Sequence, residues 1–215
     1  MTVIIAAVML FANSPQYPMF PRELEIAFAL SAAPAHVRDG ATVLALERTG
    51  YVIAKHGTNA FTCLVSRRGG DVFPVCWDAE GTRALVAVDI ADAQLRLEGK
   101  SSAEIDRIIS DGYAHGRFFA PARAGISYML SPMRYRIDAN GAVTRTTSNP
   151  HLMFYGPNLT DADIGGVRGS FAFINKVGPD GMIIVPVGSK ERDTIVGETQ
   201  PLVEQVERAI GYQSK

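Results

Sequence analysis

The sequence is poor in the residues that most metal and redox centres require, with only two cysteines and four histidines among its 215 residues. Two cysteines cannot build a four-thiolate zinc ribbon or an iron–sulfur cluster. The chain also lacks the phosphate-binding motifs GxxxxGK(S/T) and GxGxxG, the nucleophile motif GxSxG, the zinc motif HExxH and an SxxK pair. These absences argue against nucleotide-dependent, Rossmann-type and several common hydrolase chemistries. No cofactor is predicted, and a bound metal ion is left open.

Charge of one sign is not in excess, because 21 Lys and Arg residues oppose 22 Asp and Glu residues for a net charge of -1. A nucleic-acid-binding domain normally shows a basic run or face, and none is visible here. The hydrophobic content of 47% and the charged content of 20% are those of an ordinary folded domain. The sequence therefore predicts a globular protein that does not bind nucleic acid, and it leaves the oligomeric state undetermined.

The apolar run at residues 2–12 is too short to span a bilayer, so no transmembrane span is predicted. The run has the length of the apolar region of a signal peptide and is followed by small residues, but it lacks the Lys or Arg that precedes such a region. A signal for export and a buried N-terminal strand are therefore both considered. The predicted organisation is an N-terminal apolar segment at residues 1–20 and a single α+β domain at residues 21–215.

The two cysteines lie in a predicted tight hairpin, in which strands at residues 61–66 and 72–76 flank Arg-Arg-Gly-Gly-Asp. If Gly69-Gly70 form the centre of a type I′ turn, Cys63 faces Cys76 at a non-hydrogen-bonded pair, where the α-carbons come closest. This geometry accepts a disulfide. A disulfide persists in an oxidising compartment, which favours a periplasmic or secreted protein. The alternative is a reduced pair of small core residues in a cytoplasmic protein.

The remaining segments predict further hairpins and amphipathic helices, without the alternation of strands and helices that a parallel sheet requires. The expected fold is α+β: a mainly antiparallel sheet built from several hairpins, a helical hairpin insertion, and N- and C-terminal helices. The helices are expected on one face of the sheet or at its ends. The expected strands are residues 42–47, 51–55, 61–66, 72–76, 84–88, 125–131, 135–138, 142–145, 151–155, 171–177 and 182–187, and the expected helices begin at Pro21, Asp89, Ser101, Thr160 and Thr199.

His151 is the predicted catalytic base, because it stands at the mouth of a predicted strand and imidazole exchanges protons near neutral pH. Asp78 and Glu80 are its candidate carboxylate partners, since side chains two residues apart in an extended segment project to the same side. Tyr128, in the segment GISYMLSP, is a further catalytic candidate if its hydroxyl points inward. Each has a structural alternative: a backbone hydrogen bond for His151, exposed acids for the carboxylates and a core position for Tyr128.

Other polar and aromatic side chains are predicted to line a ligand site. An arginine in such a set can clamp an anionic ligand by paired hydrogen bonds, although turns and helix ends also explain these residues. The predicted ligand-binding residues are His56, Asn59, Tyr113, Arg117, Tyr155 and Asn158. A metal-binding alternative uses His56, Glu80 and His151 as ligands.

The segments TNAFTCLV, CWDAEGT, GISYMLSP and PHLMFYGPNLTDADIGG together resemble a set of exported bacterial proteins, and this resemblance implies a compartment but no reaction. The sequence thus predicts an exported bacterial protein with a small-molecule pocket near His151, acting as a cofactor-independent hydrolase or isomerase through acid–base chemistry. The alternatives are a non-catalytic ligand- or metal-binding module and a structural or partner-binding protein. An enzyme needs a concave site in which His151 meets a carboxylate, a metal module needs three converging ligands, and an interaction protein needs an exposed apolar patch.

Overall fold

The structure is a computed structural model that describes residues 18–138, 140–146, 148–169 and 171–212. The predicted N-terminal apolar segment lies outside these residues except for its last three positions. Within the described chain, no helix combines the length and the apolar character needed to cross a membrane.

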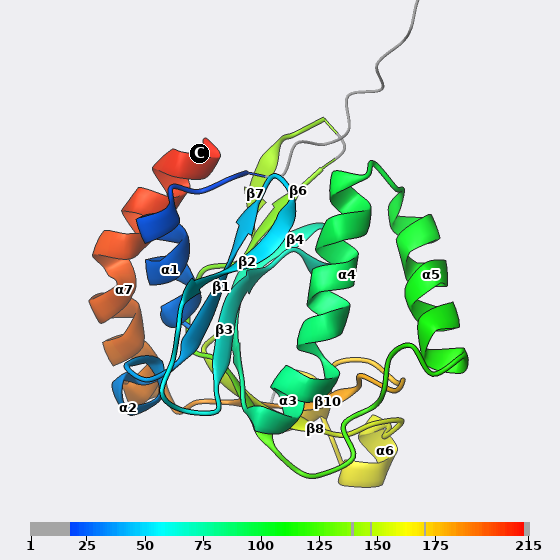
Figure 1. The fold of residues 1–215 in the computed structure, drawn as a ribbon. Coiled ribbons are helices and arrows are strands. Elements are labelled where there is room, and N and C mark those ends of the chain that lie inside the picture. Colours follow the sequence, from blue (N-terminus) through cyan, green and yellow to red (C-terminus); the bar gives the residue numbers. More distant parts are fainter. Residues whose placement is uncertain (1–17, 139, 147, 170, 213–215) are drawn as a thin grey trace, which may run out of the picture.

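The described chain has the predicted α+β fold, in which one mainly antiparallel ten-stranded sheet lies between two layers of helices. In Figure 1, α1 (Arg22–Leu30) and α7 (Ser189–Ile210) cover one face of the sheet. On the other face lie α4 (Val86–Leu97) and α5 (Ser102–Ala114). The prediction that helices lie on one face or at the ends is therefore wrong in this respect.

The sheet runs in the order β2-β1-β3-β4-β5-β8-β10-β9, and β6 and β7 form a ribbon that pairs with β4. Strands β1 and β3 are parallel, and the other described strand pairs are antiparallel. The strands are β1 (Thr42–Glu47), β2 (Gly50–Lys55), β3 (Thr62–Ser66), β4 (Asp71–Trp77), β5 (Ile126–Met129), β6 (Tyr135–Ile137), β7 (Val143–Arg145), β8 (His151–Tyr155), β9 (Phe173–Ile174) and β10 (Met182–Pro186).

The cysteine hairpin has the predicted register, in which Cys63 of β3 pairs with Cys76 of β4. The turn η1 (Arg68–Gly70) joins the strands, and Gly69 and Gly70 both adopt the positive φ that a type I′ turn demands, 65° and 85°. The two α-carbons are 4.0 Å apart and the sulfur atoms form a disulfide, which confirms the predicted bond. Both cysteines are fully buried against α1.

Two hydrophobic clusters explain why helices lie on both faces. On β3, Cys63 and Val65 point into the cluster shared with α1 and α7, whereas Leu64 points into the cluster shared with α3 and α4. A strand that is buried on both sides needs a covering layer on each, because apolar surface left in water is unfavourable. The sequence of such a central strand is a short continuous run of apolar residues. This run does not by itself show whether helices cover one face of the strand or both.

The helical hairpin insertion is present as predicted. Helix α5 starts with a complete capping box, in which Ser101 Oγ accepts a hydrogen bond from Glu104 N at 3.3 Å and Glu104 Oε2 accepts one from Ser101 N at 2.9 Å. A similar capping box at Thr160 and Asp163 begins the short helix α6 (Asp161–Ile164). A further short helix, α2 (Ala35–Arg38), follows Pro34.

The predicted strand at residues 84–88 is wrong, because these residues lie in the helices α3 (Ala79–Ala84) and α4 and in the turn between them. A short apolar run fits a buried strand and a buried helix equally well. Leu85 and Val88 are fully buried, and Leu85 packs in the cluster with Trp77 and Val75. Tertiary packing on the sheet thus decides the helical state.

The C-terminal helix starts ten residues before the predicted Thr199, and Pro201 lies inside it rather than in its first turn. Proline lacks an N–H and so removes one hydrogen bond from the helix interior. Burial of Val203, Val206 and Ile210 in the cluster shared with α1 offsets this loss.

Candidate functional site

Asp78 and Tyr155, two of the predicted site residues, meet at the end of the sheet beside α3. Asp78 caps α3: its Oδ1 accepts hydrogen bonds from Gly81 N at 2.9 Å and from the Tyr155 hydroxyl at 2.6 Å. Its Oδ2 accepts a third from Ile126 N at 2.8 Å. Burial and the hydrogen bond to Asp78 raise the pKa of Tyr155 above its usual range. Tyr155 is therefore a neutral donor that fastens β8 to α3.

Two glycines lie close to the Asp78–Tyr155 hydrogen bond and leave little space around it. A Cβ atom on Gly81 would lie 2.3 Å from the Tyr155 hydroxyl oxygen, and one on Gly125 would lie 2.3 Å from Asp78 Oδ2. Such close approach leaves no room for a substrate group between Asp78 and Tyr155. The contact between Asp78 and Tyr155 is therefore a structural hydrogen bond and not part of a cleft that admits a substrate.

Glu80 is buried beside the Asp78–Tyr155 hydrogen bond, and both of its carboxylate oxygens have hydrogen-bond partners. Its Oε1 accepts hydrogen bonds from Arg83 Nη2 and Ala122 N, both at 2.6 Å, and Arg123 Nε lies 3.6 Å from Oε2. The hydrogen bonds from Arg83 and Ala122 lower the pKa of Glu80 to about 2. Glu80 is thus an ionised acceptor that holds the segment before β5 against α3.

His151 stands at the first position of β8, as predicted, and its Nδ1 lies 2.7 Å from the carbonyl oxygen of Asn149. Burial lowers the pKa of the imidazole, and the cationic Arg134 lowers it further. The strand separates His151 from Tyr155 by four residues, which corresponds to about 13 Å. The structure therefore does not bring His151 together with the Asp78–Tyr155 contact, and it places a cation rather than a carboxylate near the imidazole.

Three of the other predicted ligand residues lie in connecting segments. Asn59 Nδ2 donates to the Val37 carbonyl at 2.8 Å, and Asn59 Oδ1 accepts from Phe61 N at 2.9 Å. Asn158 adopts a left-handed conformation with φ of 61°, which asparagine tolerates better than most residues. His56 is exposed just after β2. Asn59 and Asn158 therefore have structural explanations as turn residues.

The predicted aromatic and arginine residues make ring contacts. The ring of Tyr128 lies 5.9 Å from that of Phe61, and the ring of Tyr113 lies 5.7 Å from that of Phe118. The guanidinium of Arg117 lies 5.2 Å over the Phe118 ring. Tyr128 therefore packs on the α1 side of the sheet, whereas Tyr113 belongs to α5, which lies on the opposite face, and Arg117 follows that helix.

The structure does not assemble the predicted metal ligands. Among the described residues, no group of three or more His, Cys, Asp and Glu side chains is placed to hold a metal ion. His56, Glu80 and His151 therefore do not converge on one point.

A buried polar cluster on the α4 face has no counterpart in the sequence prediction. Asp89, expected only as a helix cap, lies inside α4, where it accepts hydrogen bonds from Ser66 Oγ at 2.7 Å and Trp77 Nε1 at 3.0 Å. Burial raises the pKa of Asp89 to about 6. The only signal in the sequence is the position of Asp89 beside Leu85 and Val88 on the apolar side of the helix.

The same cluster extends to the β9–β10 connection. Arg68 of the η1 turn forms an ion pair with the buried Asp180, which also pairs with Lys176 at 2.8 Å. The hydroxyl of Tyr113 is buried nearby without a hydrogen-bond partner among the described residues, and burial together with Asp180 raises its pKa. The cluster therefore joins β3, α4, α5 and the β9–β10 connection.

Two surface cavities lie away from His151. One, of about 340 Å³, lies between α1, α2, the end of β2 and α7. The other, of about 440 Å³, lies between the η1 turn, the α4–α5 connection and β6. The residues that line them are not those predicted for the site.

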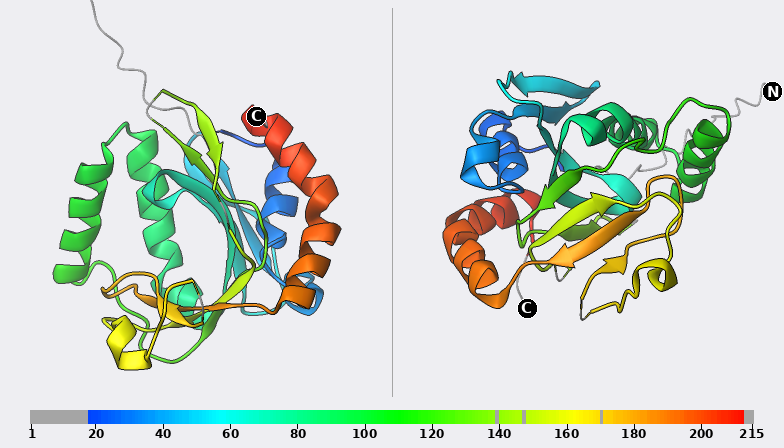
Figure 2. Two further views of the ribbon diagram at one scale, coloured as in Figure 1. Left: turned by 180° about the vertical axis from the view of Figure 1, so that it is seen from behind. Right: turned by 90° about the horizontal axis from the view of Figure 1, so that it is seen from below.

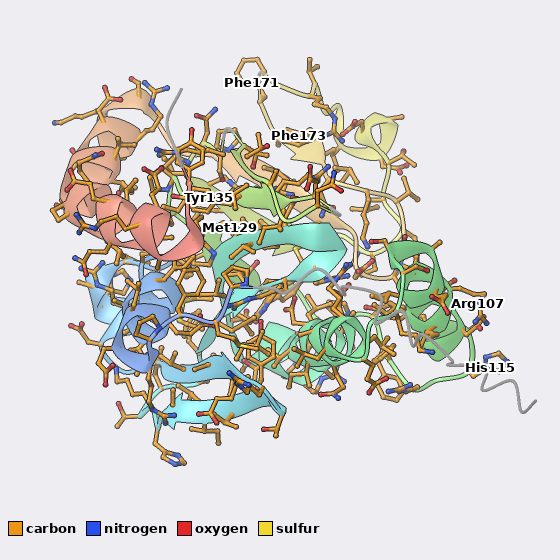
Figure 3. All side chains as sticks on the ribbon, turned by 90° about the horizontal axis from the view of Figure 1, so that it is seen from above. Arg107, His115, Met129, Tyr135, Phe171 and Phe173 are labelled. Atoms are coloured by element: carbon orange, nitrogen blue, oxygen red, sulfur yellow. A yellow bond between two sulfur atoms is a disulfide. The ribbon has the colours of Figure 1, made fainter. Side chains whose placement is uncertain are left out.

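Three strongly exposed apolar side chains lie in one segment of the chain. Phe171 is 77% exposed, Val177 62% and Val167 54%, and all three belong to the segment between β8 and β10. Figure 2 shows that α6 and the strand β9 of this segment project from the body of the molecule. In Figure 3, Phe171 lies at the outer edge of the molecule, farther out than Phe173. We call Val167, Phe171 and Val177 the apolar surface.

Comparison of the chain with family models, curated proteins and solved structures gives no match. Its function is therefore inferred from its own contacts.

Proposed function

We propose that this chain is an exported, non-catalytic interaction protein and that its apolar surface binds a second copy of the same chain. The observation that carries the proposal is the exposure of three large apolar side chains within one short segment. Single exposed apolar residues are ordinary on protein surfaces, whereas several gathered together are typical of an interface.

The segment that carries the apolar surface is firmly braced from within. Asp161 Oδ1 accepts a hydrogen bond from Ile174 N at 2.5 Å, and Arg168 Nη2 donates to Ile174 O at 2.9 Å while its guanidinium lies 4.9 Å over the Phe173 ring. Asn175 Oδ1 accepts from Met182 N at 2.8 Å. These polar groups bond to one another and hold the segment in one conformation, while the apolar side chains face outward. The surface is therefore preorganised, and preorganisation reduces the entropic cost of binding.

This bracing also indicates what kind of partner fits. An extended peptide adds to a sheet through free N–H and C=O groups on an edge strand. On β9 the N–H and C=O of Ile174 are already bonded to Asp161 and Arg168. The partner must therefore contribute side chains rather than a strand.

The charges near the apolar surface allow two copies to approach. Residues 160–181 contain three acidic and two basic side chains, so the segment carries little net charge. Lys176 and Asp180 are paired with each other, and Asp163 is engaged in its capping box. A nearly neutral apolar surface is complementary to itself under a two-fold axis, which is the commonest symmetry of protein assemblies.

The two other functions considered receive less support. An acid–base enzyme needs a carboxylate beside His151, and the described polar contact of the imidazole is with the Asn149 carbonyl. A metal module needs converging ligands, which the described residues do not supply. The proposed export rests on the Cys63–Cys76 disulfide, since such a bond persists in an oxidising compartment.

Sedimentation equilibrium of the full chain, at concentrations from about 5 to about 500 μM, tests the proposal. We expect a monomer–dimer equilibrium that Phe171→Ser combined with Val177→Ser weakens at least about tenfold. The matched control is Phe119→Ser, because Phe119 is 56% exposed but lies between α5 and β5, and this variant should associate like the wild type. A wild type that stays monomeric throughout, or a control that loses association equally, overturns the proposal.

A further inference from the structure

The cavity between α1, α2 and α7 is lined by both half-buried apolar side chains and charged side chains. Leu30 and Leu202 are among the apolar residues that line it, and Arg38, Lys55 and Glu198 are among the charged ones. Its volume of about 340 Å³ falls at the lower end of the range of small-molecule sites. It lies on the face of the sheet opposite α4 and α5, and none of its lining residues belongs to the apolar surface.

Arg38 is the first residue that points to a ligand. Its side chain lines the cavity from the last turn of α2 and is half-buried. Its guanidinium makes neither a hydrogen bond nor an ion pair with any residue in the described ranges. A guanidinium carries five N–H donors in a planar fork that matches a carboxylate, so an unpaired one at a cavity wall is suited to an anionic group.

Lys55 brings a second cation whose position is fixed by the backbone. Its Nζ donates to the carbonyl oxygens of Asp39 at 2.9 Å and of Arg38 at 3.4 Å, which hold the ammonium at the end of α2. An ammonium has three N–H groups, so one remains for a ligand. Arg38 and Lys55 thus bring two cations to the wall of one cavity.

Two carboxylates that line the same cavity supply the opposite charge. Asp39 and Glu198 are both exposed cavity residues, and neither side chain is paired within the part of the chain that the structure describes. With Arg38 and Lys55 they bring two positive and two negative charges to one cavity. A ligand of either net charge would meet repulsion from one pair, whereas a zwitterion is complementary to both.

We propose that this cavity binds a small zwitterion with an apolar side chain, which is the chemistry of an apolar amino acid. Arg38 and Lys55 bind the carboxylate, Glu198 and Asp39 bind the ammonium, and Leu30 and Leu202 contact the apolar side chain. The proposal is independent of self-association, because the two sites share no residue.

Isothermal titration calorimetry of the full chain with L-leucine and L-phenylalanine tests the proposal. We expect at least one of them to bind, and we expect its N-acetyl derivative, which lacks the ammonium, and its amide, which lacks the carboxylate, to bind at least about tenfold more weakly. These analogues require no change in the protein, so a folding defect cannot imitate the result.

Two variants locate the site. Arg38→Gln and Glu198→Gln should each weaken binding at least about tenfold. Their matched controls are Arg48→Gln in the β1–β2 turn and Glu204→Gln on α7, which change the same charges outside the cavity and should bind like the wild type. The Phe171→Ser and Val177→Ser double variant should also bind like the wild type, which separates this proposal from self-association.

Three results overturn the proposal. The first is absence of binding by both amino acids at about 10 mM, beyond the affinity range of a useful site. The second is binding of an N-acetyl or amide derivative as tightly as the parent amino acid. The third is binding by Arg38→Gln and Glu198→Gln that matches the wild type, which would place the ligand elsewhere.

Discussion

The hydroxyl of Tyr155 donates a hydrogen bond of 2.6 Å to Asp78 Oδ1 and so ties β8 to the first turn of α3. The two residues are separated by 77 positions in the chain. Their side chains therefore join elements that only the folded state brings together. Because the carboxylate also accepts hydrogen bonds from Gly81 N and Ile126 N, three parts of the chain depend on it.

Replacement of Tyr155 by Phe should lower the free energy of unfolding by about 1–3 kcal/mol, since it removes a donor to a half-buried carboxylate. Asp78→Ala should cost more, because it removes the helix cap as well as the acceptor of two further hydrogen bonds. Urea denaturation monitored by circular dichroism measures both changes. If the Tyr155→Phe variant is as stable as the wild type, the hydrogen bond between Tyr155 and Asp78 does not stabilise the fold.

Two glycine substitutions should act in opposite directions. Gly125→Ala should destabilise the protein by roughly 2 kcal/mol or more, because its Cβ would lie 2.3 Å from Asp78 Oδ2. Gly197→Ala should stabilise it by about 0.5–1 kcal/mol, because this glycine lies inside α7 with open space around its Cβ position. Thermal unfolding of the two variants beside the wild type gives the comparison, and a shift of the same sign in both would contradict it.

Removal of the disulfide should lower stability by about 3 kcal/mol, the chain-entropy value for a loop of this length. The suitable variant is Cys63→Ala with Cys76→Ala, since alanine leaves no polar group in a buried site. Denaturation in urea measures the loss. Thiol titration of the unfolded wild type should find no free thiol, and two free thiols would contradict both the bond and the compartment inferred from it.

The stability of the protein should depend on the ionisation of Asp89. Burial raises its pKa from 3.8 to about 6, so the folded state binds the proton more tightly than the unfolded state. The stabilisation from this group is therefore full below the unfolded pKa and is lost as the pH rises through the folded pKa. Asp89→Asn keeps the shape of the side chain but does not titrate.

Lowering the pH from about 7.5 to about 4.5 should raise the free energy of unfolding of the wild type, relative to Asp89→Asn, by about 2 kcal/mol. Using the difference between the two proteins cancels the contributions of the other titrating groups. Urea denaturation across this pH range provides the values. A difference that stays constant would show that the pKa of Asp89 is not shifted by folding, and one that falls as the pH falls would show that folding lowers it; either result contradicts the prediction.

Local sequence signals predicted much of the fold. The Gly69-Gly70 turn fixes the register of its hairpin, because both residues favour positive φ and side chains alternate along each strand. The disulfide follows from that register alone. The capping box at Ser101 likewise marks the start of α5, because it satisfies N–H groups that the helix leaves unpaired.

The candidate site could not be predicted in the same way. Tyr155 was expected near a ligand, but its partner Asp78 follows β4 and the contact arises only when β5 pairs with both β4 and β8. Arg68 and Asp180 are 112 positions apart and have no signal that links them. Contacts between such distant residues depend on the order of strands in the sheet, which turn chemistry and periodicity do not specify.

The sequence by itself determined the α+β class, the cysteine register and most element boundaries, because these depend on turn conformation, capping and side-chain alternation over a few neighbouring residues. The tertiary structure alone decided that residues 84–88 lie in α3, α4 and the turn between them, that helices cover both faces, and that Asp89 is buried. It also decided which apolar side chains stay in water, such as Phe171. The physical reason is that burial depends on what packs against a residue, and that partner comes from elsewhere in the chain.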